Sequence, residues 1–116
     1  MLDWAYDTFG MTALDRVERC KRVIEEAIEV GQAGGVFEEE VHRLVSYVYA
    51  RPTGKLPREI GGLGIALLAL AHFANIDAEA EEIREFERVL SLPTEHFRNR
   101  QNEKAAAGVA GKVVLP

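Results

Sequence analysis

An uncharged stretch of twelve residues, Ile60–Ala71, is the feature that most restricts how this chain folds. Its apolar side chains would lie on every side of a helix, and such a helix is buried by neighbouring helices or by a second subunit. Pro57 suits the first turn, so we expect a helix from about Pro57 to Phe73. The stretch is shorter than the roughly 20 residues that cross a bilayer. It therefore predicts the central helix of an all-α protein that assembles into an oligomer and does not enter a membrane.

Apolar residues at helical spacing predict the other helices, and Thr12 and Asp77 are plausible N-caps for two of them. Gly34-Gly35 and the segment from Arg51 to Gly54 are natural stops. The expected ranges are Thr12–Ala33, Glu38–Ala50 and Ala78–Leu90, followed after Pro93 by a segment that is partly helical to about Lys104. Together with the central helix, the three ranges predict a four-helix core.

The length of 116 residues predicts one domain over 1–116. Residues 1–11 would form an N-terminal arm, and residues 105–116 a tail that is loose or packs on a partner. The arm carries Trp4, Tyr6 and Phe9. These rings either stack on a ligand base or, the reading we favour, pack in a core or interface.

The net charge of −5 argues against nucleic acid as a partner, because binding the phosphate backbone needs a basic face. Cys20 is the only cysteine, which excludes an intrachain disulfide and a thiolate zinc cluster. The first ten residues lack the charged and apolar regions of a signal peptide. These features together favour a cytoplasmic protein.

Carboxylates gather beside the predicted apolar surfaces. Glu25 and Glu29 are four residues apart, Glu26 and Glu29 are three apart, and each pair can share a cation on one helix. Glu59 stands in the first turn of the central helix and would complete the set if the two helices face each other. Carboxylate oxygens suit Mg²⁺, which also keeps waters and substrate phosphates as ligands. The alternative is a solvated acidic face, with Glu59 favouring the positive end of its helix dipole.

Three glycines follow Glu59: Gly61, Gly62 and Gly64. Each lowers helix propensity by about 1 kcal/mol relative to Ala. Glycines clustered in this way predict that a helix, a ligand or a metal-bound phosphate approaches the backbone closely.

At these residues the chain resembles the MazG-like superfamily of all-α nucleoside triphosphate pyrophosphohydrolases. That superfamily carries EExxE on one helix and ExxD on a later one. The stretch EEAIE at 25–29 matches the first part in full, whereas EIGG at 59–62 keeps the glutamate and has Gly62 at the aspartate position. The segments RVIEEAIEVGQA, LVSYVYARPTG and REIGG are also similar to a small phage and proteobacterial subgroup that reads RxLEEALELVQA, LVDYVFxRPxG and QEVGG. The resemblance covers roughly Arg16 to Arg88.

This resemblance implies a Mg²⁺-dependent hydrolase, with Mn²⁺ as a possible substitute, that cleaves a (deoxy)nucleoside triphosphate between its α and β phosphates. The products would be a nucleoside monophosphate and pyrophosphate. It also implies a homodimer or homotetramer with sites between facing helices. Carried over by position, Glu26, Glu29 and Glu59 would bind metal, and Glu25 would be a ligand or orient water, with Glu25 and Glu29 as the catalytic pair. Gly62 removes one expected ligand, for which Asp77 or Glu25 could substitute.

Candidate substrate-binding residues lie outside the motif. Arg98 and Arg100 fall in a cationic stretch and could bind phosphates, and Lys55 lies in the loop before Glu59. Asn75 could hydrogen-bond a base or sugar, although a helix C-cap is its simpler role. His72 is more readily explained as a packed histidine than as a ligand.

Two alternatives to an active enzyme follow from the sequence. Gly62 in place of the aspartate supports a catalytically silent MazG-like relative that acts as a nucleotide-binding or assembly module. A helical nucleic-acid binder is the weaker alternative, because the acidic balance opposes it.

Overall fold

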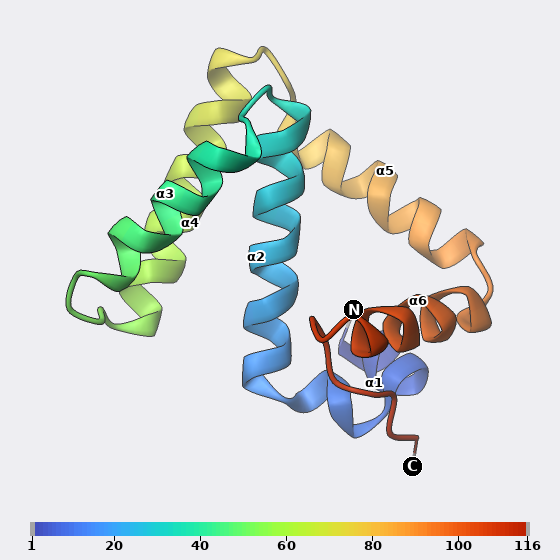
Figure 1. Ribbon diagram of the computed structural model, residues 1–116. Helices are drawn as coiled ribbons and strands as arrows, with labels where there is room; N and C mark the ends of the chain where they lie inside the picture. Colours follow the sequence, from blue (N-terminus) through green and yellow to red (C-terminus); the bar gives the residue numbers. More distant parts are fainter. Residues whose placement is uncertain (1, 116) are drawn as a thin grey trace. The chain divides into compact units, whose positions relative to one another are not determined.

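A computed structural model describes residues 2–115, and within that range every long element is helical (Figure 1). The α-helices are α1 (Leu2–Phe9), α2 (Arg16–Ala33), α3 (Glu38–Tyr49), α4 (Leu56–Phe73), α5 (Ala78–Ser91) and α6 (Thr94–Ala106), and a 3₁₀ turn, η1, spans Met11–Leu14. The described residues contain no strand, only an isolated bridge between Gly10 and Val114. The all-α prediction is therefore confirmed, whereas a four-helix core in an oligomer stays a prediction.

The expected ranges of α3, α4 and α5 agree with the observed helices to within a residue at each end. The start of α2 differs, because Asp15 rather than Thr12 is its N-cap. The Asp15 side chain accepts the backbone N–H of Glu18 at 3.0 Å, which satisfies one of the donors that a helix start leaves open. Thr12 instead lies in η1, and the arm expected before it contains α1.

Three helices end in the same way, with a residue of positive φ just past the C-cap. Gly35 follows α2, Asn75 follows α4 and Gly108 follows α6. After α4, the N–H of Ile76 donates to the Ala71 carbonyl at 2.8 Å, and the N–H of Asn75 donates to the His72 carbonyl at 3.2 Å. This pair of hydrogen bonds is the Schellman motif, which satisfies carbonyls that the last turn leaves open.

The chain divides into two compact units. The first unit joins residues 1–43 to residues 93–116, so it contains both ends of the chain. In it α1 packs on α6, with the Trp4 ring edge-on to Phe97 at 5.1 Å between centroids and to Phe9 at 5.8 Å. This is the packing role that we favoured for Trp4 and Phe9.

The tail after α6 differs from the loose or partner-bound segment expected for 105–116. Up to Leu115, where the description ends, it hydrogen-bonds within the first unit. The N–H of Met11 donates to the Val114 carbonyl at 2.9 Å, and the N–H of Val114 donates to the Phe9 carbonyl at 3.3 Å. The Thr12 hydroxyl donates to the Lys112 carbonyl. These hydrogen bonds hold the tail against the end of α1 and against η1.

The second unit, Leu44–Leu92, contains the end of α3 with α4 and α5. The central helix of the sequence prediction is present, but Ala71 is its only buried residue among those described. By length and composition α4 is also the one described helix that could cross a membrane, a weak indication because core helices pass the same test.

Candidate acidic site on α2

The helical spacing of α2 brings three carboxylates together. One carboxylate oxygen from each of Glu25, Glu26 and Glu29 lies within 4.8 Å of the others. Glu25 is half-buried, and Glu26 and Glu29 are exposed. Like charges one turn apart repel each other by about 0.2–0.5 kcal/mol per pair. A divalent cation would remove this repulsion, and the three hard oxygen donors suit Mg²⁺ or Mn²⁺.

Glu25 differs from Glu29 in having two cationic partners. Its Oε1 accepts Nη1 of Arg22 at 3.2 Å and Nζ of Lys104 at 2.7 Å, with 26% of its side chain exposed. Lys104 belongs to α6, so this ion pair ties α6 to α2. No ion pair of Glu29 occurs among the described residues. Glu29 is thus open to an external cation, whereas Glu25 must share its charge.

A pocket of about 390 Å³ adjoins this acidic cluster within the first unit. Charged and apolar side chains mix in its lining, which consists of Lys21, Arg22, Ile24, Glu25, Ile28, Glu29 and Val109. The Val109 carbonyl accepts a hydrogen bond from Nη2 of Arg22, so the tail forms one wall of the pocket. The surface that lines the pocket is almost entirely apolar, so the charged residues contribute mainly their carbon chains to it.

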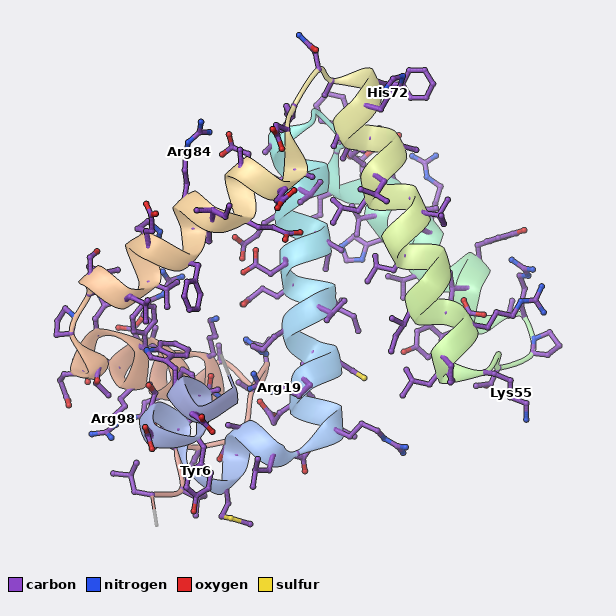
Figure 2. All side chains as sticks on the ribbon, turned by 180° about the vertical axis from the view of Figure 1, so that it is seen from behind. Tyr6, Arg19, Lys55, His72, Arg84 and Arg98 are labelled. Atoms are coloured by element: carbon purple, nitrogen blue, oxygen red, sulfur yellow. The ribbon has the colours of Figure 1, made fainter. Side chains whose placement is uncertain are left out.

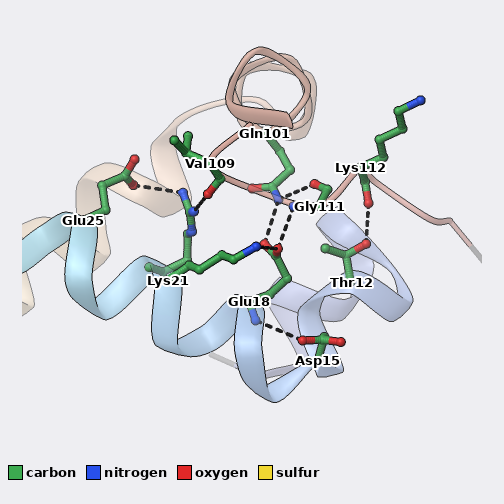
Figure 3. A network of polar contacts seen from close by, with 10 residues as sticks. Thr12, Asp15, Glu18, Lys21, Glu25, Gln101, Val109, Gly111 and Lys112 are labelled. Atoms are coloured by element: carbon green, nitrogen blue, oxygen red, sulfur yellow. Dashed lines mark hydrogen bonds and ion pairs between the residues drawn. The ribbon is translucent and has the colours of Figure 1, made fainter. Parts of the chain in front are cut away.

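Beside the pocket, a buried polar network holds the tail against α2 (Figure 3). The Glu18 side chain is 6% exposed as a residue, and its Oε1 accepts the N–H of Gly111 at 2.6 Å. The amide Nε2 of Gln101 donates to the Gly111 carbonyl at 2.8 Å and to Oε2 of Glu18 at 3.4 Å. Lys21 adds an ion pair to Oε1 of Glu18 at 3.6 Å.

Neither the burial of Glu18 nor its hydrogen bond with Gln101 was predicted from the sequence. Glu18 also lies in the first turn of α2, where acidic residues are common, so its position alone carried no signal. The two groups that donate hydrogen bonds to its carboxylate, the Gln101 amide and the Gly111 N–H, lie more than eighty residues further along the chain. Only the folded unit shows that this carboxylate is buried.

Glu59 belongs to the second unit, so the expected meeting with the α2 cluster stays a prediction. It lies in the first turn of α4, and its carboxylate folds back over Gly54. A Cβ added to Gly54 would come within 3.3 Å of Cγ of Glu59 and closer still to Oε1. Gly54 therefore makes room for this side chain, which gives a physical reason for the glycine in the loop.

The glycines after Glu59 have no close neighbour in the described chain. A Cβ added to Gly61, Gly62 or Gly64 meets nothing within 4 Å, so the close approach that we expected is not made by the chain itself. At Gly62 the open space also leaves room for the aspartate that the MazG-like motif would carry.

The four candidate substrate-binding residues have different surroundings. Arg98 donates from Nε to the Thr8 carbonyl at 2.8 Å and from Nη2 to the Asp7 carbonyl at 3.0 Å, so its guanidinium caps the C-terminal end of α1. Arg100 is exposed on the same helix, α6. Arg98 therefore has a structural role that is sufficient to explain it, and Arg100 does not.

The other two candidates lie in the second unit, at opposite ends of α4. Lys55 is exposed in the loop before the helix, as Figure 2 shows. Asn75 has φ of 58° and completes the Schellman motif, which is the C-cap role considered for it. His72 is exposed, with its ring edge-on to Phe73 at 5.6 Å between centroids. Lys55, His72 and Asn75 all belong to the second unit, whereas the α2 cluster belongs to the first.

Comparisons of this chain with protein-family models, with curated proteins and with solved structures found no match.

Proposed function

We propose that the protein is a Mg²⁺-dependent nucleoside triphosphate pyrophosphohydrolase that releases a nucleoside monophosphate and pyrophosphate. The observation that carries the proposal is the convergence of Glu25, Glu26 and Glu29 within 4.8 Å on one helix, next to a pocket of about 390 Å³. The resemblance to the MazG-like motif at these same residues supports it.

In this proposal Glu26 and Glu29 hold the metal from α2, and Glu59 adds a carboxylate from α4. The bound Mg²⁺ would supply charge stabilisation to the triphosphate and lower the pKa of a bound water. Glu25 orients the attacking water or serves as a further ligand. Arg22 and Lys104 contact Glu25 at 3.2 and 2.7 Å. In this proposal the two cations also bind the negative charge of an incoming phosphate.

Arg100 and Lys55 are the exposed cations that we propose for phosphate contacts, with Asn75 near the base or sugar. Arg98 donates hydrogen bonds to the Thr8 and Asp7 carbonyls at the end of α1. A phosphate that binds the Arg98 guanidinium would have to compete with these two carbonyls.

The test is product analysis with a panel of nucleoside triphosphates, first with Mg²⁺ and then with Mn²⁺. We expect monophosphate and pyrophosphate from the wild type. In Glu29→Gln and Glu59→Gln we expect turnover to fall at least about a hundredfold, because each replaces a charged oxygen donor that acts on the transition state. Glu103→Gln, at an exposed position on α6, is the control and should keep full activity. Normal hydrolysis by both site variants would refute the assignment.

A second variant tests the missing aspartate directly. Gly62→Asp restores the ExxD pattern at a position where a Cβ meets nothing within 4 Å. We expect tighter Mg²⁺ binding, measured by calorimetry, and faster turnover. Gly64→Asp introduces the same charge two residues away, also into open space, and should give neither effect.

A catalytically silent relative that binds nucleotide or assembles is the second candidate. Gly62 and the neutralisation of Glu25 by Arg22 and Lys104 favour it. This candidate predicts nucleotide binding without pyrophosphate release with either metal, including in Gly62→Asp.

A further inference from the structure

Four contacts within the first unit form a closed ring between α2, the end of α6 and the tail. Nζ of Lys104 donates to Oε1 of Glu25 at 2.7 Å, and the Lys104 carbonyl accepts the N–H of Val109 at 2.9 Å. The Val109 carbonyl accepts Nη2 of Arg22, whose Nη1 contacts Oε1 of Glu25 at 3.2 Å. Figure 3 shows Glu25 and Val109 joined through this guanidinium. We call these four residues the Glu25 ring, because one carboxylate closes it.

The closed ring depends on the charge of a single oxygen. Both cations contact Oε1 of Glu25, and the side chains of Lys104 and Arg22 are only 24% and 18% exposed. Water therefore screens these ion pairs less than pairs on an open surface. Nε of Arg22 is buried and has no hydrogen-bond partner among the described residues, which costs free energy. Opening the ring would recover this cost.

We propose that Lys104 and a divalent cation compete for Glu25, so that metal binding at the α2 cluster opens the Glu25 ring and releases the tail. This inference rests on the proposed function, because it takes the cluster as the metal site. The ammonium of Lys104 already occupies a cation position there. Mg²⁺ binds a carboxylate oxygen at about 2 Å, so on Oε1 of Glu25 it would lie within about 5 Å of Nζ of Lys104. Like charges at that distance repel, and Glu25 cannot serve both at full strength.

The competition also decides when the two cations can bind a phosphate. In the closed ring the charge of Glu25 neutralises Arg22 and Lys104, so the metal-free protein is a poor phosphate binder. Once a metal draws on Glu25, both side chains can form charge-assisted hydrogen bonds to an anion. Release of the tail also moves Val109, which forms one wall of the pocket. The metal would therefore bind first and prepare the site for the phosphate.

Mn²⁺ binding to the full chain, measured without nucleotide from the electron paramagnetic resonance signal of free Mn²⁺, tests the competition. Lys104→Met removes the competing cation and should tighten Mn²⁺ binding at least about fivefold, the lower end of ordinary coupling between two sites. Lys112→Met removes the same charge from the tail, where the side chain is exposed and points away from the network in Figure 3. We expect it to change the affinity by less than about twofold, because solvent and salt screen an exposed charge.

The possible outcomes separate this inference from the proposed reaction. Equal Mn²⁺ affinity in Lys104→Met and Lys112→Met would overturn the competition and leave the reaction to its own test. Absence of Mn²⁺ binding in the wild type and in both variants would remove the metal site, and the proposed function with it. Lys104→Arg keeps the positive charge and should bind Mn²⁺ as weakly as the wild type. Tight binding by Lys104→Arg as well would show that the charge is not what competes.

Hydrogen exchange of the wild type, with and without saturating Mg²⁺, tests the opening without any substitution. The N–H of Val109 donates to Lys104, and the N–H of Gly111 donates to Glu18. We expect Mg²⁺ to speed exchange at these two amides, because the tail loses its hold on α2 when the ring opens. Exchange at Ala80, whose N–H is bonded within the second unit, should stay the same. Unchanged or slower exchange at Val109 with Mg²⁺ bound would refute the opening.

Discussion

At the scale of single residues, Glu18 shows how position changes the role of a glutamate. It lies two turns before Glu25 on the same helix, yet it is buried and bonded to the tail, whereas Glu26 and Glu29 face water. The backbone N–H of Gly111 and the amide of Gln101 replace the water that a carboxylate loses on burial. Glu18 therefore belongs to the structure of the first unit, and the candidate metal ligands belong to its surface.

Glu18→Ala should lower the free energy of unfolding by about 1–3 kcal/mol, because it leaves the partly buried N–H of Gly111 without its acceptor and removes one of the two acceptors of the Gln101 amide. Urea denaturation at fixed protein concentration measures the change. Glu103→Ala removes an exposed glutamate from α6 and should change stability by less than about 0.5 kcal/mol. Equal effects of the two substitutions would contradict the role of the network.

At the scale of elements, the helices are stabilised by local pairs as well as by packing. On α5, Arg84 pairs with Glu81, and Arg88 donates to Glu85 from Nε at 3.0 Å and from Nη2 at 2.6 Å. The hydrogen bond from Arg88, aided by its charge, lowers the pKa of Glu85 below its usual value despite some desolvation. More than half of each side chain is exposed, so solvent screens the pair.

Arg88→Gln should raise the pKa of Glu85 toward its ordinary value, which an NMR titration of that carboxyl measures. A carboxylate with a lowered pKa stabilises the fold at pH values above its unfolded-state pKa and loses this contribution as the pH falls through its folded-state pKa. The variant should thus be less stable by no more than about 0.5 kcal/mol at neutral pH, with the difference vanishing in acid. Arg84→Gln should leave the pKa of Glu85 unchanged, and an equal shift in both variants would refute the pairing.

At the scale of the whole molecule, residues from the two ends of the sequence form one unit. The tail contacts Phe9 and Met11 through backbone hydrogen bonds and Arg22 and Glu18 through side chains. The same tail provides Val109 to the pocket beside the acidic cluster. The stability of this unit and the shape of the candidate site are therefore linked.

Deletion of residues 109–116 should loosen α1 and η1 and open the pocket, because Glu18, Gln101 and Arg22 would all lose acceptors or donors in the tail. Hydrogen exchange should become faster at amides of the first unit, Ala13 among them, and stay unchanged in α5 of the second unit. Unchanged exchange at Ala13, whose N–H donates to the Gly10 carbonyl at 3.1 Å, would show that the tail is dispensable.

The sequence by itself determined the helices and most of their ends. Periodic apolar residues and caps such as Asp77 act over a few residues, so they could be found without the fold. The convergence of Glu25, Glu26 and Glu29 was predictable for the same reason, since one helix sets their spacing. The start of α2 was misplaced because Thr12 and Asp15 are both good caps, and the choice between them depends on the contact of Thr12 with the tail.

Only the tertiary structure decided which polar residues are buried and what the tail does. Glu18 hydrogen-bonds with Gln101, Lys104 pairs with Glu25, and Arg98 donates to the Thr8 carbonyl. Each of these pairs joins residues that lie far apart in the sequence, and no local pattern encodes pairing over such distances. The apolar surface of α4 was visible in the sequence, but the fold showed that one chain leaves it exposed. Local hydrogen bonds and periodicity specify helices, whereas burial and long-range ion pairs exist only once distant segments meet.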